Sequence, residues 1–534
     1  MMSDEKFRLH PISAIINCVK GLKDLLIPFF IIFVGKGFKF NFDPHDEGFF
    51  WDSLPILIAG VLLVLNFVSG VVKWRRFVYW FEDDELRIEY GLFVKKKRYI
   101  PFERIQSLNY QEGILHRPLQ LVKVSVETAA SKDKKAEAEL TAITRTAADM
   151  IELEMKRAKR GKQQVKQGLA QNELLHEIDH DNKSEIDGDS ASVSSQQEFR
   201  IQEDEIVQRE VIHRMSVKDL LILATTSGGV GVVFSGLVAI ASQFGDIIPY
   251  DYLYDEIRVF VKVGVLLVML AVFLVLFVAW GVSFVLTLFN YYSFIVEREN
   301  DKLIITRGLL EKRRVTIPLN RIQGIKIVEN PLRQMFGYAT VTVESAGGSM
   351  QNGEKKIILM PLVKKRDAIA ALQRLFPEIN WLPTLTRSPK RARPSYYKIG
   401  LLWILPVTAV VSYLFFPYGL LSLLIIPLLI LLGVWQHKTA GYALDGYQLT
   451  VVYRTISRTS FFMEKKRLQQ MTMRQTYFKK RIGIASLRTT IMSGSMGASA
   501  TIAHFEKTDI EKLMAWYEPN AKSAYDVEKS ISEP

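Results

Sequence analysis

The stretch Asp301–Ala346, DKLIITRGLLEKRRVTIPLNRIQGIKIVENPLRQMFGYATVTVESA, decides the fold because the chain contains it more than once. Subtracting 217 from each residue number lays it without gaps on Asp84–Ala129, and 18 identities join Trp80–Ala129 to Glu297–Ala346. Adding 146 finds a third, weaker copy, marked by Leu449, the trio Arg467, Leu468 and Gln469, and Gly483. Such internal similarity predicts one structural unit used three times.

Length and composition indicate a membrane protein with several domains. A chain of 534 residues is too long for one core, so three or four domains are expected. Hydrophobic residues make up 49%, yet the net charge is +13, as in membrane proteins whose basic parts face anionic lipid. We discount nucleic acid as the partner because the basic surplus lies beside apolar spans and no nucleic-acid motif occurs. The single cysteine, Cys18, excludes an internal disulfide scaffold and a cysteine metal cluster.

Apolar runs occur in three pairs, and each pair precedes one copy of the repeat. The predicted spans lie within Met1–Val34, Leu54–Val72, Leu220–Phe244, Val263–Phe289, Ile399–Phe416 and Tyr418–Trp435. In the first, Leu25–Val34 alone is too short to cross ~30 Å of hydrocarbon. We expect that span to begin as an amphipathic helix near Ile12. The repeating unit is therefore a helical hairpin followed by a polar module.

The charges beside the spans predict the orientation, because basic loops stay in the cytoplasm. Basic residues flank the module side of the spans at Lys73, Arg75, Arg76, Arg209, Arg214, Lys218, Lys390, Arg391, Arg393 and Lys398. The loops within the first two pairs carry acids instead, at Asp43, Asp46, Glu47, Asp52, Asp246, Asp251, Asp255 and Glu256. Both termini and all three polar modules are therefore predicted to be cytoplasmic.

Each polar module shows short runs with period-two alternation, such as Lys123–Glu127 and Thr340–Glu344, which predict antiparallel strands. A helix closes the copies, most clearly over Lys364–Phe376 and over Thr508–Tyr517, where Thr508 and Glu511 form a capping box. Several strands and one terminal helix predict a small barrel or sandwich with a helical plug.

The motifs of the second copy resemble the bacterial pleckstrin-homology (PH) domain of the membrane-associated type, which in its three-repeat form gives the YdbT-type transmembrane proteins. The motifs are Gly308–Arg313, Ile317–Gln323, Pro331–Gly337 and Val343–Gly347. Copy one departs at Gln120, where the motif has glycine, and copy three has Arg454 instead of the hairpin glycine. The resemblance implies a PH-like β-barrel, a bacterial cytoplasmic membrane, no established reaction, and a smaller single-module relative as partner.

The predicted fold class is an α+β membrane protein with six transmembrane helices in three hairpins, each followed by a cytoplasmic PH-like β-barrel with a C-terminal helix. The hairpins are expected over residues 1–76, 213–291 and 381–437, and the PH-like domains over 77–155, 292–380 and 438–520. A charged insertion, 156–212, and a disordered tail, 521–534, complete the division. The wider insertion between the first two copies, Ser131–His213, contains Ala147–Leu175, whose composition favours a helix, and Ser184–Gln197, which has too little apolar content to fold.

Two sets of polar residues are candidates for a site. The repeat motif residues have a structural interpretation, in which they link neighbouring strands or join module to membrane helix: Arg104, Gln106, Arg321, Gln323, Arg467 and Gln469. Alternatively, Arg321 contacts an anion or lipid headgroup, since guanidinium binds phosphate bidentately. The basic hairpins are candidates for lipid or anion contact: Lys95, Lys96, Lys97, Arg98, Lys312, Arg313 and Arg314. Their alternative is a solvated strand edge protected by charge.

His176, Glu177 and His180 match the H-E-x-x-H pattern of zinc proteases. The surrounding segment is polar and acidic, with little apolar material for a closed pocket, so we interpret the match as chance in a linker. No metal, cofactor or catalytic residue is predicted. There is no phosphate-binding loop and no G-x-S-x-G elbow, and ionisable residues cluster at the span ends, which disfavours a transporter.

The sequence thus predicts a non-enzymatic scaffold or interaction platform that resembles factors of envelope-stress resistance. A set of modules that binds anionic lipid is the first alternative, and a membrane zinc protease is the second. The expected partners are membrane lipids, a smaller single-module relative, and further copies of the same chain, with no nucleic acid.

Overall fold

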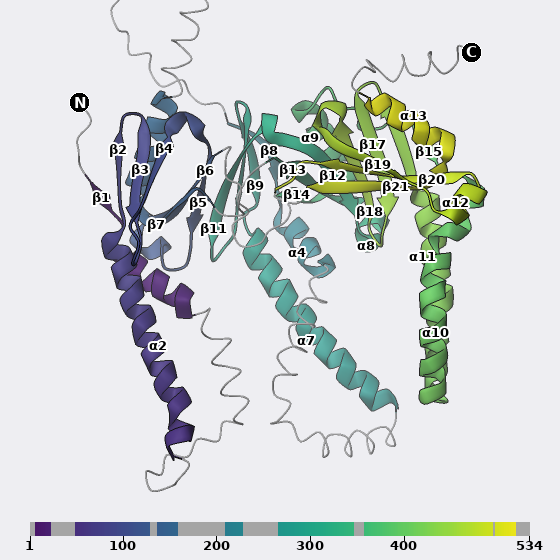
Figure 1. Ribbon diagram of the computed structural model, residues 1–534, viewed down its shortest axis with the longest axis horizontal. Helices are drawn as coiled ribbons and strands as arrows, with labels where there is room; N and C mark the ends of the chain where they lie inside the picture. The colour runs from purple at the N-terminus through teal and green to yellow at the C-terminus, as the bar shows by residue number, and fades with distance from the viewer. Residues whose placement is uncertain are drawn as a thin grey trace, which may run out of the picture.

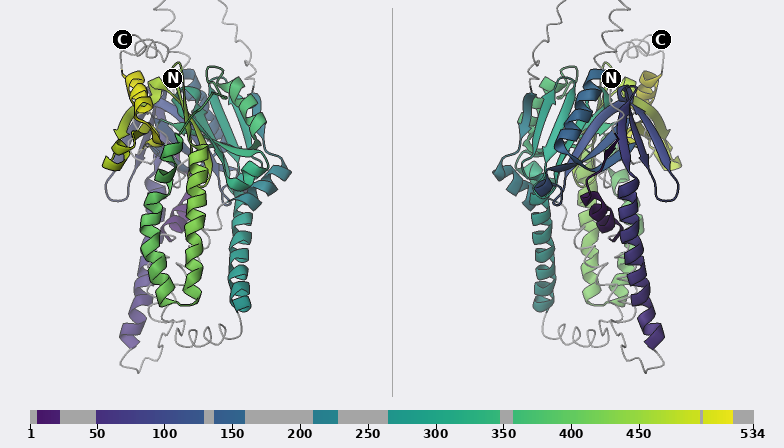
Figure 2. Two further views of the ribbon diagram at one scale, coloured as in Figure 1. Left: turned by 90° about the vertical axis from the view of Figure 1, so that its right-hand side faces the viewer. Right: turned by 90° about the vertical axis from the view of Figure 1, so that its left-hand side faces the viewer.

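The computed structural model describes residues 6–22, 49–128, 136–158, 209–227, 265–346, 357–494 and 497–518. Three β-rich modules lie side by side in a row, in chain order (Figure 1). Long helices extend from the same side of all three modules, as the views turned by 90° also show (Figure 2). The three copies of the repeat therefore share one orientation relative to the helices.

Within the described residues, four apolar helices are long enough to cross a membrane. Their apolar stretches cover Leu57–Arg76, Val272–Tyr291, Lys390–Leu414 and Gly419–Thr439. The first two lie within α2 (Phe49–Arg76) and α7 (Val265–Tyr291). The last two consist of α10 (Lys398–Leu414) and α11 (Ile425–Thr439), each with a 3₁₀ segment before it, Lys390–Tyr396 and Tyr418–Leu424. Their side chains are largely exposed, as expected for a lipid-facing surface. The third predicted hairpin is therefore present as α10 and α11.

The other two predicted hairpins are described only in part. A shorter apolar helix, Ile12–Leu22, packs beside α2, where Asn66 Nδ2 donates to the Cys18 carbonyl at 2.9 Å. Helix α4 (Val217–Thr226) begins the predicted span Leu220–Phe244 and is capped by Ser216. The remaining parts of those spans lie outside the described residues, so the total of six spans stays a prediction.

Each module consists of a first half-sheet, a second half-sheet and a closing helix. Module one contains β1 (Phe7–Arg8), β2 (Val78–Glu82), β3 (Glu85–Tyr90) and β4 (Lys96–Pro101), then β5 (Ile105–Glu112), β6 (Leu121–Thr128) and β7 (Ala138–Thr144), and a helix over residues 145–158. Module two contains β8 (Arg209–Arg214), β9 (Ile295–Glu299), β10 (Lys302–Arg307) and β11 (Lys312–Pro318), then β12 (Ile322–Glu329), α8 (Pro331–Met335), β13 (Tyr338–Ser345), β14 (Ile357–Lys364) and α9 (Lys365–Leu375). Module three contains β15 (Thr386–Arg387), β16 (Gly441–Asp445), β17 (Gln448–Arg454) and β18 (Arg458–Glu464), then β19 (Leu468–Arg474), α12 (Tyr477–Arg481), β20 (Ile484–Ile491), β21 (Ala498–Glu506) and α13 (Lys507–Tyr517).

A single corner motif joins the two half-sheets of every module. A one-turn 3₁₀ helix follows the fourth strand at Phe102–Arg104, Leu319–Arg321 and Lys465–Arg467. A β-bulge comes next, and the extra residue is Gln106, Gln323 or Gln469. Because a bulge bends and twists a strand, the repeated Arg-Ile/Leu-Gln trio marks the point where the chain turns from one half-sheet into the other.

The half-sheets continue from one module into the next. Strand β5 of module one pairs antiparallel with β11 of module two, and β12 of module two pairs antiparallel with β18 of module three. We call these contacts joint one and joint two. They create two seven-stranded sheets, leaving a four-stranded sheet at one end of the row and a three-stranded sheet at the other.

Each module has its own apolar core beneath its closing helix. Fully buried members include Leu86 and Ile151 in module one, Leu303 and Leu372 in module two, and Leu449 with Trp516 in module three. Phe462 of module three joins the core of module two, with its ring 4.8 Å from that of Trp381. Joint two is therefore an extension of a core as well as of a sheet.

Gln120 occupies the position of the motif glycine and adopts the same left-handed backbone. Its φ is 53°, compared with 70° at Gly337 and 69° at Gly483. A Cβ at Gly337 would meet nothing within 4 Å, so the position has room for a side chain. The departure in copy one is thus accommodated without a change of fold.

The start of the predicted helical segment Ala147–Leu175 belongs to module one. Residues 145–158 are helical, and Ile151 and Met155 are buried in the module core. The rest of the predicted helical segment, and the His176–His180 match, lie outside the described residues.

Candidate functional site

The hairpin between the third and fourth strands of each module ends against a membrane helix. Four hydrogen bonds make these contacts: Arg76 Nη1 to the Leu92 carbonyl, Gly308 N to the Tyr292 carbonyl at 2.8 Å, Leu309 N to the Phe289 carbonyl at 2.8 Å, and Gln436 Nε2 to the Thr455 carbonyl at 3.0 Å. The basic hairpins predicted from sequence therefore begin at the end of the module that adjoins the helices.

Exposed apolar side chains gather at this end of all three modules. They come from the hairpin tips and from the connection after the fifth strand: Phe93, Val94, Ile114, Leu115, Leu119, Leu310, Leu332, Met335, Phe336, Ile456, Tyr477, Phe478 and Ile482. We call this set the membrane-facing rim. Phe93 is 91% exposed and Phe478 is 80% exposed, which is unusual for aromatic residues unless they meet a partner or a bilayer. Pro331–Gly337, which the family resemblance identifies as a fold motif, thus also has an exposed apolar face that the sequence pattern does not reveal.

Cations accompany the rim. Helix α12 places Lys480 and Arg481 beside Tyr477 and Phe478, and all four side chains are exposed. Lys479 is half-buried and donates to Ser486 Oγ at 2.9 Å, and burial lowers its pKa. Aromatic and basic residues together are typical of surfaces that lie at the headgroup level of a membrane.

A cavity of about 410 Å³ opens between the rim of module one and the hairpin tip of module two. Ile16, Ile114, Leu286 and Leu310 supply apolar walls, and Lys20 supplies a cation. Such a mixture suits the glycerol and phosphate region of a lipid.

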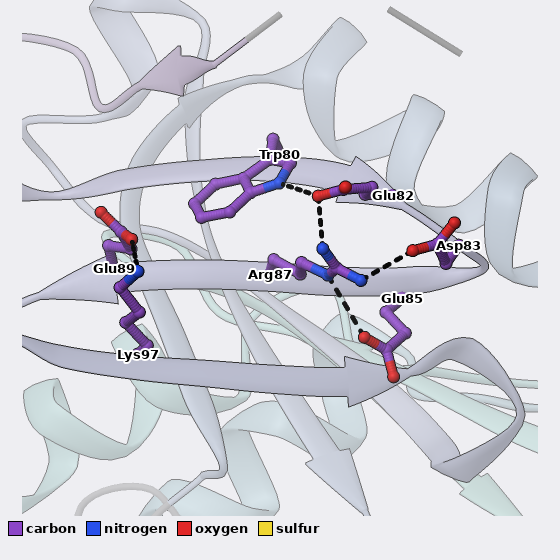
Figure 3. A network of polar contacts seen from close by, with 7 residues as sticks. All are labelled: Trp80, Glu82, Asp83, Glu85, Arg87, Glu89 and Lys97. Carbon is purple, nitrogen blue, oxygen red and sulfur yellow. Dashed lines mark hydrogen bonds and ion pairs between the residues drawn. The ribbon is translucent and has the colours of Figure 1, made fainter. Parts of the chain in front are cut away.

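Among the strands that the structure describes, the basic hairpin of module one lies on an open sheet edge. Glu89 pairs with Lys95 at 2.6 Å and with Lys97 at 3.1 Å, the latter drawn in Figure 3. Hydrogen bonds from these lysines hold the pKa of Glu89 below its ordinary value, Lys95 having the larger effect. Arg98 donates to the Glu137 carbonyl of the same module, while Lys96 points to solvent.

The basic hairpin of module two lies within joint one. Lys312 is directly opposite Glu112, and Arg314 is opposite Tyr110, with its guanidinium 5.6 Å from the ring centre. Arg313 donates to Glu311 at 2.7 Å. The two hairpins that look alike in sequence therefore have different surroundings, one on an open edge and one between modules.

Joint two repeats the register of joint one. Adding 217 to Glu112 gives Glu329, and adding 146 to Lys312 gives Arg458, and these two residues are again directly opposite, with Arg458 Nη1 3.6 Å from Glu329 Oε2. Lys365 also reaches Glu329, at 2.7 Å. A cation facing a carboxylate is thus the shared feature of both joints.

A buried ion pair lies deeper in joint two. Lys326 Nζ is 2.5 Å from Glu344 Oε1, and both side chains are buried. Lys326 also lies 4.4 Å from the ring centre of Phe461, and Ser493 of module three donates to the second oxygen of Glu344. Because breaking such a pair leaves an uncompensated charge, it fixes how modules two and three meet.

Arg454, which replaces the hairpin glycine in copy three, is buried at the meeting point of α11, module two and module three. Its guanidinium donates to Thr439 Oγ1 at 3.1 Å, to the Ile456 carbonyl at 2.9 Å and to Gln334 Oε1 at 2.6 Å. It also lies 3.8 Å from the ring centre of Trp435. The structure therefore places Arg454 as a link between a membrane helix and two modules.

The repeat motif residues lie at the corners between half-sheets. Arg104 and Gln469 are exposed, Gln106, Arg321 and Arg467 are half-buried, and Gln323 is buried. Burial lowers the pKa of Arg321, and the Glu127 carboxylate of module one partly offsets this effect. Gln323 Nε2 donates to the Arg321 carbonyl at 3.2 Å. Their role stays a prediction.

The outer face of the first half-sheet differs between modules. In module one, Arg87 lies among three carboxylates, pairing with Glu82 at 2.5 Å, Asp83 at 2.8 Å and Glu85 at 3.3 Å (Figure 3). The equivalent residues, Ile304 and Thr450, are buried, at 3% and 1% exposure. The preceding module covers this face in module two, where Lys156 of module one approaches Glu299 at 3.9 Å. In module three, Asn380 N, which follows α9 of module two, donates to Gln448 Oε1 at 2.7 Å.

Comparison with known proteins agrees with the repeat. The model of the bacterial PH domain family matches residues 28–159, 219–377 and 400–521. The chain is 33% identical over 523 residues to the UPF0699 transmembrane protein YdbT of Bacillus subtilis (strain 168), covering 97% of this chain and 99% of that protein. No solved structure matches the chain. Each matched segment contains one of the modules described above apart from its first strand, β1, β8 or β15. The chain belongs to the bacterial PH domain family of membrane proteins.

Proposed function

We propose that this chain is a non-enzymatic membrane scaffold that presents three PH-like modules as one joined platform. The observation that carries the proposal is the common register of joints one and two, which makes two continuous seven-stranded sheets. Main-chain pairing at both joints supports a fixed spacing of the modules and of any proteins bound to them. Family membership agrees with a binding role.

Disulfide crosslinking tests the platform. In a Cys18→Ser background, Gln111→Cys with Arg313→Cys examines joint one, and Val328→Cys with Thr459→Cys examines joint two. Both pairs are directly opposite in the register. We expect each pair to crosslink within one chain in native membranes. The mismatched pair Gln111→Cys with Thr459→Cys is the control, and equal crosslinking of this pair would mean that the modules move independently.

The proposed location is the bacterial cytoplasmic membrane, crossed several times, with the modules and both termini in the cytoplasm. The basic last turn of α2, Lys73, Arg75 and Arg76, supports this orientation. A Lys96→Cys variant in a Cys18→Ser background should react with a membrane-impermeant maleimide only after the cells are permeabilised. Labelling in intact cells would reverse the orientation.

The finer parts of the proposal are a role in envelope-stress resistance and a partner such as a smaller single-module relative. Both rest on the family resemblance. A deletion strain should be more sensitive to a cell-wall-active antibiotic, and a copy with either joint disrupted by Gly324→Trp or Arg314→Glu should fail to complement it. Full complementation by these variants would show that the platform is not needed for that role.

A second candidate function is contact with anionic lipid through the membrane-facing rim. The observation that favours it is the exposed pair Tyr477 and Phe478 beside Lys480 and Arg481. A nitroxide attached at Phe478→Cys in vesicles should be protected from aqueous nickel reagents, more so with anionic lipid. Tyr447, which is 59% exposed in the turn before β17, is the matched control site, and equal accessibility at both sites would remove the candidate.

A further inference from the structure

The row of modules ends in two strand edges whose equivalents are paired elsewhere in the chain. Strand β4 corresponds to β11 and β18, each of which pairs with the preceding module. Strand β19 corresponds to β5 and β12, each of which pairs with the following module. In the described part of the chain, β4 pairs only with β3, and β19 only with β20. The edges of β7 and β14 are also open. The equivalent edge is open in every module, so it does not mark an end of the row.

The exposure of β4 agrees with a missing neighbour. Lys96, Lys97, Arg98 and Tyr99 are all exposed, whereas the equivalent residues of β18, Thr459 to Phe462, are half-buried or buried. Both joints use the same pairing, so the strand that would complete β4 has a defined register. In joint one, Lys312, Arg313 and Arg314 face Glu112, Gln111 and Tyr110. The strand that completes β4 would face Lys95, Lys96 and Lys97 in the same order.

This register identifies the chemistry of the missing strand. Position 95 is a cation in all three copies, as Lys95, Lys312 and Arg458, and the two paired cations face Glu112 and Glu329. The strand for β4 therefore carries a carboxylate opposite Lys95. The chain's own β19 does not, because its equivalent residue is Gln475, and the residue before it, Arg474, would face Lys96. Like charges directly opposite each other disfavour pairing.

We propose that the outer edge of β4 binds the fifth strand of a PH-like module in a different polypeptide, as an antiparallel continuation of the sheet with a partner carboxylate opposite Lys95. This inference rests on the proposed scaffold function and names the partner's chemistry. A module bound in this way would also cover the open face around Arg87. On that face, Glu82 is equivalent to Glu299 of module two. Lys156 of module one, the preceding module, approaches Glu299.

An acid-bearing copy of the chain serves as the probe. Arg474→Gln with Gln475→Glu gives β19 the Gln-Glu sequence that faces β11 in joint one. This donor carries Met473→Cys, and a separately tagged acceptor carries Lys97→Cys, because positions 473 and 97 correspond to Tyr110 and Arg314. Both are full chains with Cys18→Ser, produced together in one membrane and oxidised. The control donor carries Arg488→Gln with Thr490→Glu on β20, one strand inward, which changes the net charge equally.

We expect the acid-bearing donor to form about fivefold more acceptor–donor disulfide than either the donor with native residues 474 and 475 or the control donor. Lys95→Glu in the acceptor should abolish the gain. No gain from the acid-bearing donor would overturn the proposal. Equal crosslinking of the native donor would also overturn it, because the occupant would then be a second copy of this chain. Intramolecular crosslinking at joints one and two is scored in the same cells, so the platform is judged separately.

Discussion

Arg454 of module three donates from Nη2 to Gln334 Oε1 of module two over 2.6 Å, although the two residues are 120 positions apart. The family motif has glycine at this hairpin position, where Gly91 and Gly308 adopt φ values of 139° and 107°. Copy three replaces the turn glycine with a side chain that bonds to a membrane helix and to a neighbouring module. The joint between modules two and three is therefore held from the hairpin as well as from the strands.

Replacing Arg454 with methionine should destabilise the chain by about 2–3 kcal/mol, because a buried charge-assisted hydrogen-bond network is lost. Thermal unfolding in detergent should show a midpoint lower by several degrees. Arg454→Lys keeps the charge but cannot bond to Gln334 and Thr439 together, so it should be intermediate. An Arg454→Met protein with the native midpoint would contradict this role.

The buried Lys326–Glu344 pair predicts a non-additive result. Lys326→Met alone leaves the Glu344 carboxylate buried without its cation and should cost about 3–5 kcal/mol. Adding Glu344→Gln removes the charge and should restore most of the lost stability. Chemical denaturation of the two variants measures the difference, and a double variant as unstable as the single one would refute the pairing.

Two left-handed glycines should respond differently to alanine. At Gly308, φ is 107° and a Cβ would lie 2.0 Å from the Glu311 carbonyl oxygen, so alanine should cost about 3 kcal/mol or more. At Gly337, φ is 70° and the space is open, so alanine should cost about 1 kcal/mol. Protease resistance and unfolding midpoints should rank the variants in that order, and the reverse order would contradict the hairpin geometry.

Module three should lose stability in mild acid through His504. Burial, with a smaller effect from Lys479, lowers the pKa of His504 to about 4. Unfolded histidine binds its proton near pH 6.5, so stability is complete above that pH and falls as the pH drops towards 4. The full loss is about 3 kcal/mol. His504→Asn, which suits the φ of 61°, should flatten the pH profile between 6.5 and 4, and an unchanged profile would assign the acid sensitivity elsewhere.

The repeat and the strands could be predicted from sequence because side-chain periodicity reports burial. The joints could not, because pairing between strand edges is made mainly by backbone groups, which every sequence carries. Lys95 and Lys312 are the same residue in the same motif, yet only the second lies between modules. The sequence carries one signal of the joints. Arg87 of copy one is replaced by Ile304 in copy two and by Thr450 in copy three, where a preceding module covers that position. The exposure of Phe336 and Phe478 in the rim could not be predicted, because an aromatic residue within a motif looks the same in the sequence whether it lies in the core or on the surface.

The paired strands have a consequence for how such chains grow. In each unit the fourth strand can pair with the preceding unit and the fifth strand with the following unit. Because β4 and β19 do not pair with each other in the described residues, the units form an open row and not a ring. Duplication of a hairpin with its module would lengthen the row while every existing interface stayed intact. Copy number is therefore free to vary in evolution, while the unpaired edges remain those of the first and last units.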